Sequence, residues 1–369
     1  MLSRFVVFAS VFQLVLGLVH FFLYETWVWF WVPSDSYTYL KLEIGLGILS
    51  ISFLAASLLA FRSYHILVRA VYRLAAVWLG FVNYSFFAAC GCWVLYGLAR
   101  LGGLGLERRE LISAFLALAL SVTTYGIING LLVRVKRITI ALPNLPAAWQ
   151  GRVAVLVSDL HLGHVRNFGF SRRIATRIAG LRPDVVFIGG DFYDGTPADL
   201  AKLAKPWSTL ATPWGTYFVE GNHEEFSDPN KYLKALTQAG VQVLNNGKVM
   251  VDGLQLVGVN YRDATHGEHF RRTLRNTGLE RGQPSILLTH APDRVQITEE
   301  EGISLQLSGH THRGQFSPWT GVAARIYGPY VYGLQRMGKL QIYTSCGVGT
   351  WGPPLRVGSK PEIVMIRFE

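Results

Sequence analysis

The sequence predicts a chain of two parts, a bundle of membrane-spanning helices followed by a layered α/β domain. Half of the 369 residues are apolar and only 16% are charged, which is high apolar content for a soluble protein. The charge is uneven, because residues 1–150 contain eleven of the 35 Lys and Arg residues and five of the 24 Asp and Glu residues. After the linker "ALPNLPAAWQG", long apolar runs give way to short runs of strand length, which indicates a second domain of a different class.

Four apolar stretches are long enough to cross a bilayer, which requires ~20 mostly apolar residues. The first follows Arg4, as in a signal peptide, but continues into "TWVWFW" without a small-residue cleavage site, so we interpret it as an uncleaved anchor. The aromatic residues before Pro33 are typical of a belt at the membrane interface, and they are Trp27, Trp29, Phe30 and Trp31. The expected spans are 5–30, 40–61, 74–99 and 111–133, within a transmembrane domain 1–138, followed by a linker 139–150 and a second domain 151–369.

The basic residues beside the spans predict the orientation of the chain. Seven lie on one side and four on the other, and the richer side is expected in the cytoplasm. The second domain is then cytoplasmic, and the chain is an integral protein of a bacterial inner or plasma membrane. The seven are Arg4, Arg62, Arg69, Arg73, Arg134, Lys136 and Arg137, and the four are Lys41, Arg100, Arg108 and Arg109.

The composition and the positions of charged residues also argue against several classes of protein. Anionic lipid headgroups account for the net charge of +11, so nucleic-acid binding is not expected. Three cysteines cannot form a disulfide framework. Polar residues inside the spans, such as Asn83 and Asn129, either line a cavity or pair across helices. Glu25 and Glu43 lie near span ends, which argues against a transporter.

The second domain alternates short apolar runs with helical patterns. The runs have the length of strands, and helices are expected at 171–181 and 229–239. This alternation predicts an α/β layered fold. The expected strands are 153–157, 185–188, 217–219, 254–259, 286–288 and 303–307.

Polar residues that can bind metals follow five of these runs. Open α/β sheets place their sites at the carboxyl ends of strands. Each residue alone is equally well explained as a turn, a cap or a loop histidine, but the ordered set favours one shared site. The set is Asp159 and His161, then Asp191 and Asp194, then Asn222 and His223, then His290, and finally His310 and His312.

The motifs D-x-H, G-D-x-x-D, G-N-H-E, a single His and G-H-T-H resemble, in order, those of the calcineurin-like metallophosphoesterases. The resemblance covers residues 150–369. Within that family, the tail "YTSCGVGTWGPPLRVGSKPEI" is similar to that of membrane-associated bacterial enzymes allied to the UDP-diacylglucosamine hydrolases. The resemblance implies a two-sheet αββα sandwich of mixed α+β and α/β character, with two divalent metal ions.

The resemblance also implies a role for each motif residue. A hydroxide between the two ions would attack phosphorus, and His223 would serve as general acid or as donor to the departing oxygen. Oxygen and imidazole ligands suit Mn, Fe, Zn or Mg. The implied ligands are Asp159, His161 and His312 for one ion, Asn222, His290 and His310 for the other, and Asp191 as the bridge.

Other residues near the motifs have two interpretations each. Asp194 either holds a ligand imidazole or caps a turn. Glu224 either orients the ring of His223 or turns to solvent. His164 and Arg166 either contact a phosphate or have ordinary surface roles. The resemblance implies that Arg356 either supports a metal ligand or contacts the substrate. The aromatic and basic segment 313–339 either rests on the bilayer, covers an acyl chain, or packs against the sheet edge.

The sequence therefore predicts a membrane-bound dinuclear-metal phosphohydrolase that cleaves a phosphoester or pyrophosphate bond of a phospholipid or a lipid-linked sugar phosphate. The bilayer is the expected partner, and no protein partner is predicted. One alternative is a hydrolase of soluble nucleotides or phosphoproteins that is only anchored at the membrane. Another is a non-catalytic scaffold, which a missing ligand or a replaced His223 would favour; neither occurs here.

Overall fold

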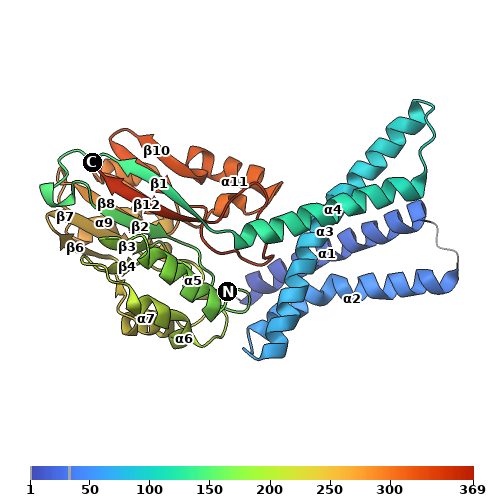
Figure 1. The fold of residues 1–369 in the computed structure, drawn as a ribbon, viewed down its shortest axis with the longest axis horizontal. Helices are drawn as coiled ribbons and strands as arrows, with labels where there is room; N and C mark the ends of the chain where they lie inside the picture. Colours follow the sequence, from blue (N-terminus) through green and yellow to red (C-terminus); the bar gives the residue numbers. More distant parts are fainter. Residues whose placement is uncertain (1, 32–34) are drawn as a thin grey trace. The chain divides into compact units, whose positions relative to one another are not determined.

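The computed structural model describes residues 2–31 and 35–369, and contacts between Cα atoms divide the chain into two units (Figure 1). The helical unit comprises residues up to 128 together with 352–355. The sheet unit comprises residues 129–351 and 356–369. The two interpretations that rest on the side chain of Arg4 and on Pro33 lie outside what the structure describes.

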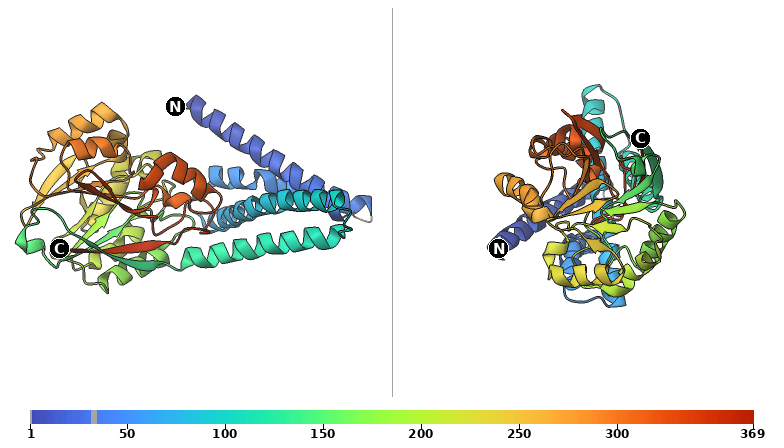
Figure 2. Two further views of the ribbon diagram at one scale, coloured as in Figure 1. Left: turned by 90° about the horizontal axis from the view of Figure 1, so that it is seen from above. Right: turned by 90° about the vertical axis from the view of Figure 1, so that its left-hand side faces the viewer.

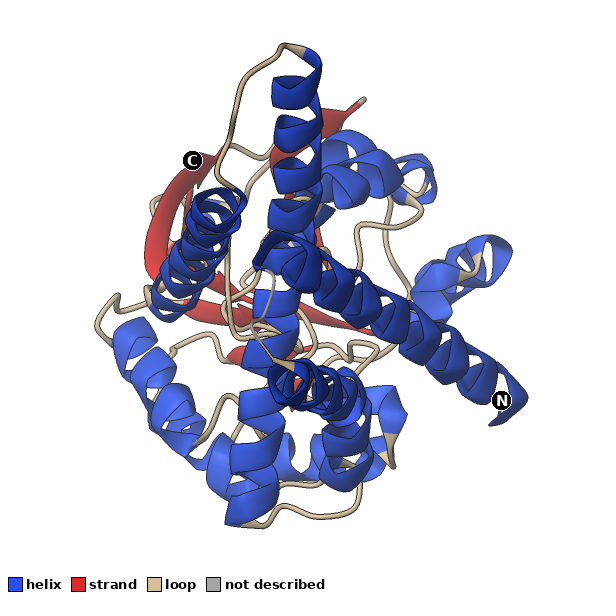
Figure 3. Ribbon diagram, turned by 90° about the vertical axis from the view of Figure 1, so that its right-hand side faces the viewer, coloured by secondary structure: helices blue, strands red, loops and turns tan. Residues whose placement is uncertain are grey.

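The helical unit contains four helices that are long and apolar enough to cross a membrane, drawn in blue in Figure 3. Many of their large apolar side chains are exposed, as expected for a surface that faces lipid. The four predicted spans are therefore present, with different ends; the second begins earlier because Asp35 caps it by accepting from the amide of Thr38 at 2.8 Å. The helices are α1 (Leu2–Trp31), α2 (Ser36–Ala60), α3 (Ile66–Leu101) and α4 (Arg108–Leu131).

The aromatic residues at the end of α1 make contacts within the bundle, although Trp31 is 36% exposed, and their place at a membrane interface stays a prediction. Phe30 is fully buried, and Trp29 stacks near Trp93 with ring centroids 4.5 Å apart. Polar groups in the spans pair across helices: Trp93 Nε1 donates to Thr26 Oγ1 at 3.0 Å. These contacts tie α1 to α3, as expected where an unpaired donor would meet hydrocarbon.

The sheet unit contains two mixed six-stranded sheets. The first sheet has the order β1-β12-β2-β3-β4-β5 and the second has the order β10-β11-β9-β8-β7-β6. The first comprises β1 (Arg134–Ile140), β2 (Val153–Val157), β3 (Val185–Ile188), β4 (Thr216–Phe218), β5 (Gln242–Val243) and β12 (Glu362–Phe368). The second comprises β6 (Gly247–Val251), β7 (Leu254–Val259), β8 (Ser285–Thr289), β9 (Leu305–Ser308), β10 (Gly333–Met337) and β11 (Leu340–Thr344).

Helices cover the outer faces of both sheets (Figure 2). The helices are α5 (Phe168–Ala179), α6 (Leu200–Ala204), α7 (Pro229–Gln238), α8 (Tyr261–Thr265), α9 (Gly267–Asn276), α10 (Val295–Glu300) and α11 (Trp319–Tyr327). Short 3-10 turns occur at η1 (Ala147–Trp149), η2 (Lys205–Thr209), η3 (Glu224–Phe226), η4 (His312–Gly314) and η5 (Gly328–Val331).

The side-chain alternation of β2 explains why its sequence is apolar without a break. Val155 and Val157 pack outward in a cluster with Ile174 of α5, whereas Ala154 and Leu156 pack inward against the second sheet. A strand covered on both faces carries apolar residues at every position. The same division gives a core between the sheets and one core on each outer side. The predicted layered fold, with helices around two sheets, is confirmed.

Three strands of the first sheet, β1, β5 and β12, are not among those that the sequence predicts. β1 pairs in parallel with β12, and β12 pairs antiparallel with β2. β1 lies where the end of the membrane domain and the start of the linker were expected, and it begins only three residues after Leu131 ends α4. The basic residues Arg134 and Arg137 therefore belong to an edge strand, where charged side chains discourage further strand pairing.

Candidate active site

The strand ends of both sheets bring the predicted donors together. The parallel strands β2, β3 and β4 of the first sheet lead into one set of loops, and β8 and β9 of the second sheet lead into another. Because parallel strands end at the same edge, residues far apart in sequence meet there. Asp159 and His161 follow β2, Asp191 follows β3, Asn222 and His223 follow β4, His290 follows β8, and His310 and His312 follow β9.

The first donor group consists of Asp159, His161 and His312. The Nε2 atoms of the two imidazoles are 3.0 Å apart, and Asp159 Oδ1 lies 3.5 Å from Nε2 of His312. Each residue offers an atom within 4.8 Å of the others, which is close enough for one cation to reach all three.

The second donor group consists of Asp191, His290 and His310, with Asn222 beside it. His290 Nε2 lies 3.1 Å from Asp191 Oδ2, 3.1 Å from His310 Nδ1 and 3.2 Å from Asn222 Oδ1. The same Oδ2 of Asp191 is 3.8 Å from Nε2 of His161 in the first group. One carboxylate oxygen thus faces both groups.

The electrostatics of these groups favour positive charge. Asp159 and Asp191 are buried, and their carboxylates share the site with imidazoles. Burial lowers the pKa of His290, but Asp191 and Asp159 outweigh burial, so that the pKa of His290 is raised. Converging nitrogen and oxygen atoms in a buried, negatively charged setting fit divalent cations of the borderline or hard kind.

The backbone at the donors is strained. Asp159, His161, Asp191, His310 and His312 all have positive φ, between 47° and 69°. Residues with a Cβ atom adopt this left-handed region at a cost of ~1–2 kcal/mol each. Such conformations concentrate at functional sites, where the surrounding structure holds them in place.

Two glycines let these loops approach each other. A Cβ atom at Gly221 would collide with Oδ1 of Asp191, and a Cβ atom at Gly309 would collide with Ser158 and Asp159. Only glycine therefore fits at these two positions. This crowding explains why the G-N-H and G-H-T-H motifs each begin with glycine.

His223 lies beside the first donor group. Its Nδ1 donates to the backbone oxygen of Asp194 at 3.0 Å, which leaves Nε2 available for other chemistry. Burial lowers the pKa of His223, and the carboxylate of Asp191 opposes this. Asp194 Oδ1 lies 3.5 Å from Nδ1 of His161, the nitrogen that faces away from His312. The carboxylate of Asp194 therefore faces the side of His161 opposite His312.

Glu224 is fully buried, so the interpretation in which it turns to solvent is wrong. Its oxygens accept hydrogen bonds from the backbone amides of Asp191, Tyr193 and Gly221, at 3.1, 3.1 and 2.9 Å. The carboxylate therefore fastens the loop after β3 to the loop after β4. Burial and the nearby Asp191 raise the pKa of Glu224.

Arg356 is fully buried and holds His312. Its Nη1 donates to the backbone oxygen of His312 at 2.9 Å, and its Nη2 lies 3.0 Å from Nδ1 of the ring. Burial and then the charge of Arg356 hold the pKa of His312 well below its ordinary value. An imidazole kept unprotonated retains a lone pair for a cation.

Two other candidates are buried instead of lying on the surface. His164 Nδ1 lies 3.0 Å from Thr196 Oγ1. Arg166 Nη2 donates to the backbone oxygen of Gly130, in the last turn of α4, at 3.0 Å, and to Thr350 Oγ1 at 3.1 Å. The surface alternative is wrong for both residues, and the hydrogen bonds of Arg166 fix the end of a helix.

Four aromatic residues lie around the donors, and only Tyr327, in the segment 313–339, and Trp351, in the tail, belong to stretches that the sequence singled out. Phe226 and Trp351 flank His223, with ring centroids 4.5 and 5.9 Å from its ring. Tyr261 and Tyr327 flank His310 at 5.3 and 6.1 Å. They follow the motifs at no fixed spacing, so their positions emerge only from the folded chain.

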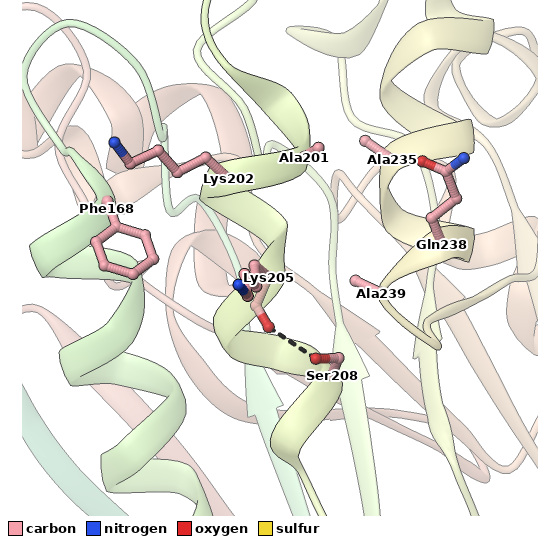
Figure 4. A pocket seen from close by; sticks show the side chains of 8 residues that line it. All are labelled: Phe168, Ala201, Lys202, Lys205, Ser208, Ala235, Gln238 and Ala239. Carbon is pink, nitrogen blue, oxygen red and sulfur yellow. Dashed lines mark hydrogen bonds between the residues drawn. The ribbon is translucent and has the colours of Figure 1, made fainter.

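A pocket of about 510 Å³ lies away from these donors, on the helices that cover the first sheet (Figure 4). It is lined by Phe168, Ala201, Lys202, Lys205, Ser208, Ala235, Gln238 and Ala239. No predicted site residue is among them. The candidate site is therefore defined by the strand ends and not by this pocket.

Comparison with known proteins gives the family. The model of the calcineurin-like phosphoesterases matches residues 153–314. The chain is 31% identical over 280 residues to a transmembrane protein with metallophosphoesterase domain of Danio rerio, covering 71% of this chain and 63% of that protein. It is 30% identical over 260 residues to an uncharacterized metallophosphoesterase of Aquifex aeolicus, covering 68% of this chain and 98% of that protein. The chain belongs to the calcineurin-like phosphoesterase family.

Similarity to solved structures is weaker. A crystal structure of a dimetal phosphatase from Danio rerio is 11% identical, with a TM-score of 0.39, and covers 60% of this chain and 100% of that one. The chain matches 63%, 59% and 59% of the lengths of three relatives, from Danio rerio and two strains of Helicobacter pylori. The family and the two donor groups together indicate two divalent metal ions.

Proposed function

We propose that this chain is a membrane-bound phosphohydrolase that cleaves a phosphoester or pyrophosphate bond of a lipid or a lipid-linked sugar phosphate. The proposed ligands are Asp159, His161 and His312 for one cation, Asn222, His290 and His310 for the other, and Asp191 for both. The oxygen of Asp191 that faces both donor groups supports its bridging role.

The residues divide the chemistry among themselves. When bound, two divalent cations supply Lewis-acid activation of water and of the phosphoryl group. His223 is the proposed proton donor to the departing oxygen, because its Nδ1 is committed to the backbone of Asp194 and its Nε2 is not. Asp194 and Arg356 position His161 and His312 respectively. Glu224 holds two of the site loops in register.

The observation that carries the lipid part of the proposal is the connection between α4 and the site. Asn129, in the last turn of α4, donates through Nδ2 to the backbone oxygens of Arg356 and Ser359 at 2.9 and 3.0 Å. Arg356 in turn donates to His312. One residue, Arg356, therefore separates the end of a candidate span from a proposed ligand, which supports a substrate held in the bilayer.

The apolar rim at His223 supports the same substrate class. Phe226 is 50% exposed and Trp351 is 53% exposed, although both rings lie against the proposed proton donor. Large exposed apolar groups at the mouth of a site favour a ligand with an apolar part. A departing group that carries hydrocarbon has such a part.

The proposed orientation places the sheet unit in the cytoplasm of a bacterial cell. Seven basic residues flank the spans on that side and four on the other. The cytoplasmic leaflet carries anionic lipids, which attract basic flanks.

The test is a substrate screen with the full chain in proteoliposomes, with Mn²⁺, Mg²⁺, Fe²⁺ or Zn²⁺ supplied in turn. Phosphatidic acid, a polyprenyl pyrophosphate and a UDP-linked acylated sugar are compared with soluble nucleotides and p-nitrophenyl phosphate. We expect the highest kcat/KM on a lipid substrate, and none with Asp191→Asn. A preference for nucleotides would overturn the lipid part. Absence of turnover on every ester by metal-loaded protein would overturn the enzymatic part in favour of a scaffold.

A further inference from the structure

The helix α11 carries an exposed apolar face. Val322 is 46% exposed and Ile326 is 68% exposed, and Trp319, which is 48% exposed, lies on the same side of the helix. Spacings of three and four residues place these side chains on one stripe. Among the described residues of the sheet unit, few other large apolar side chains are this exposed.

The opposite face of α11 attaches the helix to the sheet unit. Ala323 is buried and Tyr327 is partly buried, with its ring near His310. These residues recur at the same helical spacing, shifted around the axis from the exposed stripe. The helix is therefore amphipathic, and its exposed stripe is not needed to hold it in place.

Both ends of the segment that contains α11 are tied to residues near the end of α4. Before the helix, the amide of Ser317 donates to the backbone oxygen of Val357 at 2.9 Å. Val357 adjoins Arg356, whose backbone oxygen accepts from Asn129 of α4. After the helix, Tyr332 accepts from Lys136 Nζ at 3.1 Å, five residues beyond the last residue of α4.

We infer that α11 lies in the membrane interface, with Trp319, Val322 and Ile326 inserted among the headgroups and the first acyl carbons. Consecutive Cα atoms are ~3.8 Å apart, so the ties at Val357 and Lys136 keep α11 close to the point where α4 leaves the bilayer. A lipid surface is the occupant that fits an apolar stripe at this position.

The flanking chemistry agrees with a lipid surface. Tryptophan is enriched at membrane interfaces, and Arg325 lies beside the apolar stripe on the exposed side of the helix. Arg313, just before the helix, stacks over the ring of Tyr332 at 4.8 Å. Basic side chains that border an apolar helical face are typical of helices lying at anionic membrane surfaces.

The consequence concerns the depth of the site. α11 begins seven residues after His312, and its last residue, Tyr327, lies near His310. A helix fixed at the interface would therefore hold His310, which lies against Tyr327, close to the headgroups. This inference rests on the membrane location of the chain and not on which phosphoester is cleaved.

The experiment measures depth directly, without any substrate. An environment-sensitive fluorophore is attached at Ile326→Cys in the full chain, reconstituted in vesicles whose lipids carry a nitroxide on the acyl chain. The chain without the added cysteine gives the background from Cys90, Cys92 and Cys346. Matched controls are Ala324→Cys, on the other exposed side of α11, and Met250→Cys, on the edge strand β6.

We expect quenching at position 326 to exceed that at 324 and 250 about twofold or more, as for a side chain ~5–10 Å below the headgroup boundary. Equal quenching at all three positions would overturn the inference. Weak lipid quenching together with self-quenching that disappears on dilution with unlabelled protein would also overturn it, in favour of contact between two copies. Because no turnover is measured, the result is independent of the proposed function.

Discussion

The helical unit and the sheet unit of this chain differ in where their large apolar side chains lie. In the helical unit, large apolar side chains such as Leu74 and Leu98 point outward, whereas in the sheet unit side chains such as Phe187 and Leu288 are fully buried. Polar groups in the helical unit show the reverse, since Thr26 and Ser85 are buried. The difference teaches that lipid and water select for opposite surfaces. Chemistry in the sheet unit is thus expected to be separable from insertion of the helices.

Replacement of Asp191 gives the strongest test of this separation. Asp191→Asn removes the charge that faces both donor groups, so we expect loss of bound metal and a fall in turnover of more than ~10²–10³-fold. Insertion, measured by protease protection in membranes, stays unchanged because no helix is touched. Asp252→Asn, at an exposed turn between β6 and β7, is the matched control. Normal turnover of purified Asp191→Asn protein would refute the assignment.

Replacement of His223 separates proton transfer from metal binding. His223→Ala is expected to lower turnover by ~10²–10⁴-fold, the usual loss for a general acid. Metal content, measured by mass spectrometry, is expected to stay near the original level, because His223 is not one of the proposed metal ligands. His269→Ala, which removes an exposed histidine paired with Asp263, is the control. Loss of both metals from His223→Ala would show that its role is ligation.

Replacement of Arg356 tests the positioning of His312. Burial and the charge of Arg356 lower the pKa of His312, so Arg356→Gln raises it and lets protons compete with metal at higher pH. We expect metal affinity to fall ~10–100-fold and the pH midpoint of metal binding to move upward. Titrations of bound metal at several pH values measure both. Arg336→Gln, at an exposed arginine, is the control, and an unchanged midpoint would contradict the proposed role.

A smaller effect is expected at Glu301, far from the donors. Burial raises its pKa, but Arg275, Arg281 and Arg271 outweigh burial and lower the pKa to about 2. The carboxylate therefore stabilises the fold above its ordinary pKa of 4.5, and this contribution is lost as the pH falls toward about 2. Glu301 is only 2% exposed, whereas two of its arginine partners are more than half exposed, so solvent screens the pairs.

We expect Glu301→Gln to lower the free energy of unfolding at pH 7 by about 1–3 kcal/mol. The difference from the original chain narrows below pH 4.5 and vanishes near pH 2. Thermal unfolding of the detergent-solubilised full chain across this range measures it. Glu268→Gln, at an exposed partner of Arg271, is expected to change little. A difference in the free energy of unfolding that stays the same at the lowest pH would disprove the charge effect.

Local patterns in the sequence were sufficient for much of this architecture. Long apolar runs indicated the four spans, because crossing a bilayer imposes a length that any window can detect. The polar residues after apolar runs indicated one site, because strand ends of a parallel sheet converge. The structure brings Asp159, Asp191, Asn222 and His290 into one neighbourhood, as those patterns predict, while their roles as ligands remain proposals.

What the sequence did not indicate depends on distant contacts. β1 contains basic residues that were assigned to a cytoplasmic flank, because an edge strand tolerates charges and has little hydrophobic signal. Glu224 was interpreted only toward His223 or solvent, whereas its partners are backbone amides in two loops. Arg166 has its partner in α4, and nothing near position 166 in the sequence marks Gly130.

The left-handed backbone at the donor residues limits how this arrangement could be transplanted. An engineer who copied the seven ligand side chains onto another sandwich would misdirect five of them, because the backbone at Asp159, His161, Asp191, His310 and His312 is left-handed. The loops, with glycines at 221 and 309, would have to be moved as whole pieces. The transferable unit is therefore the set of loops together with their ligands, and not the ligand side chains alone.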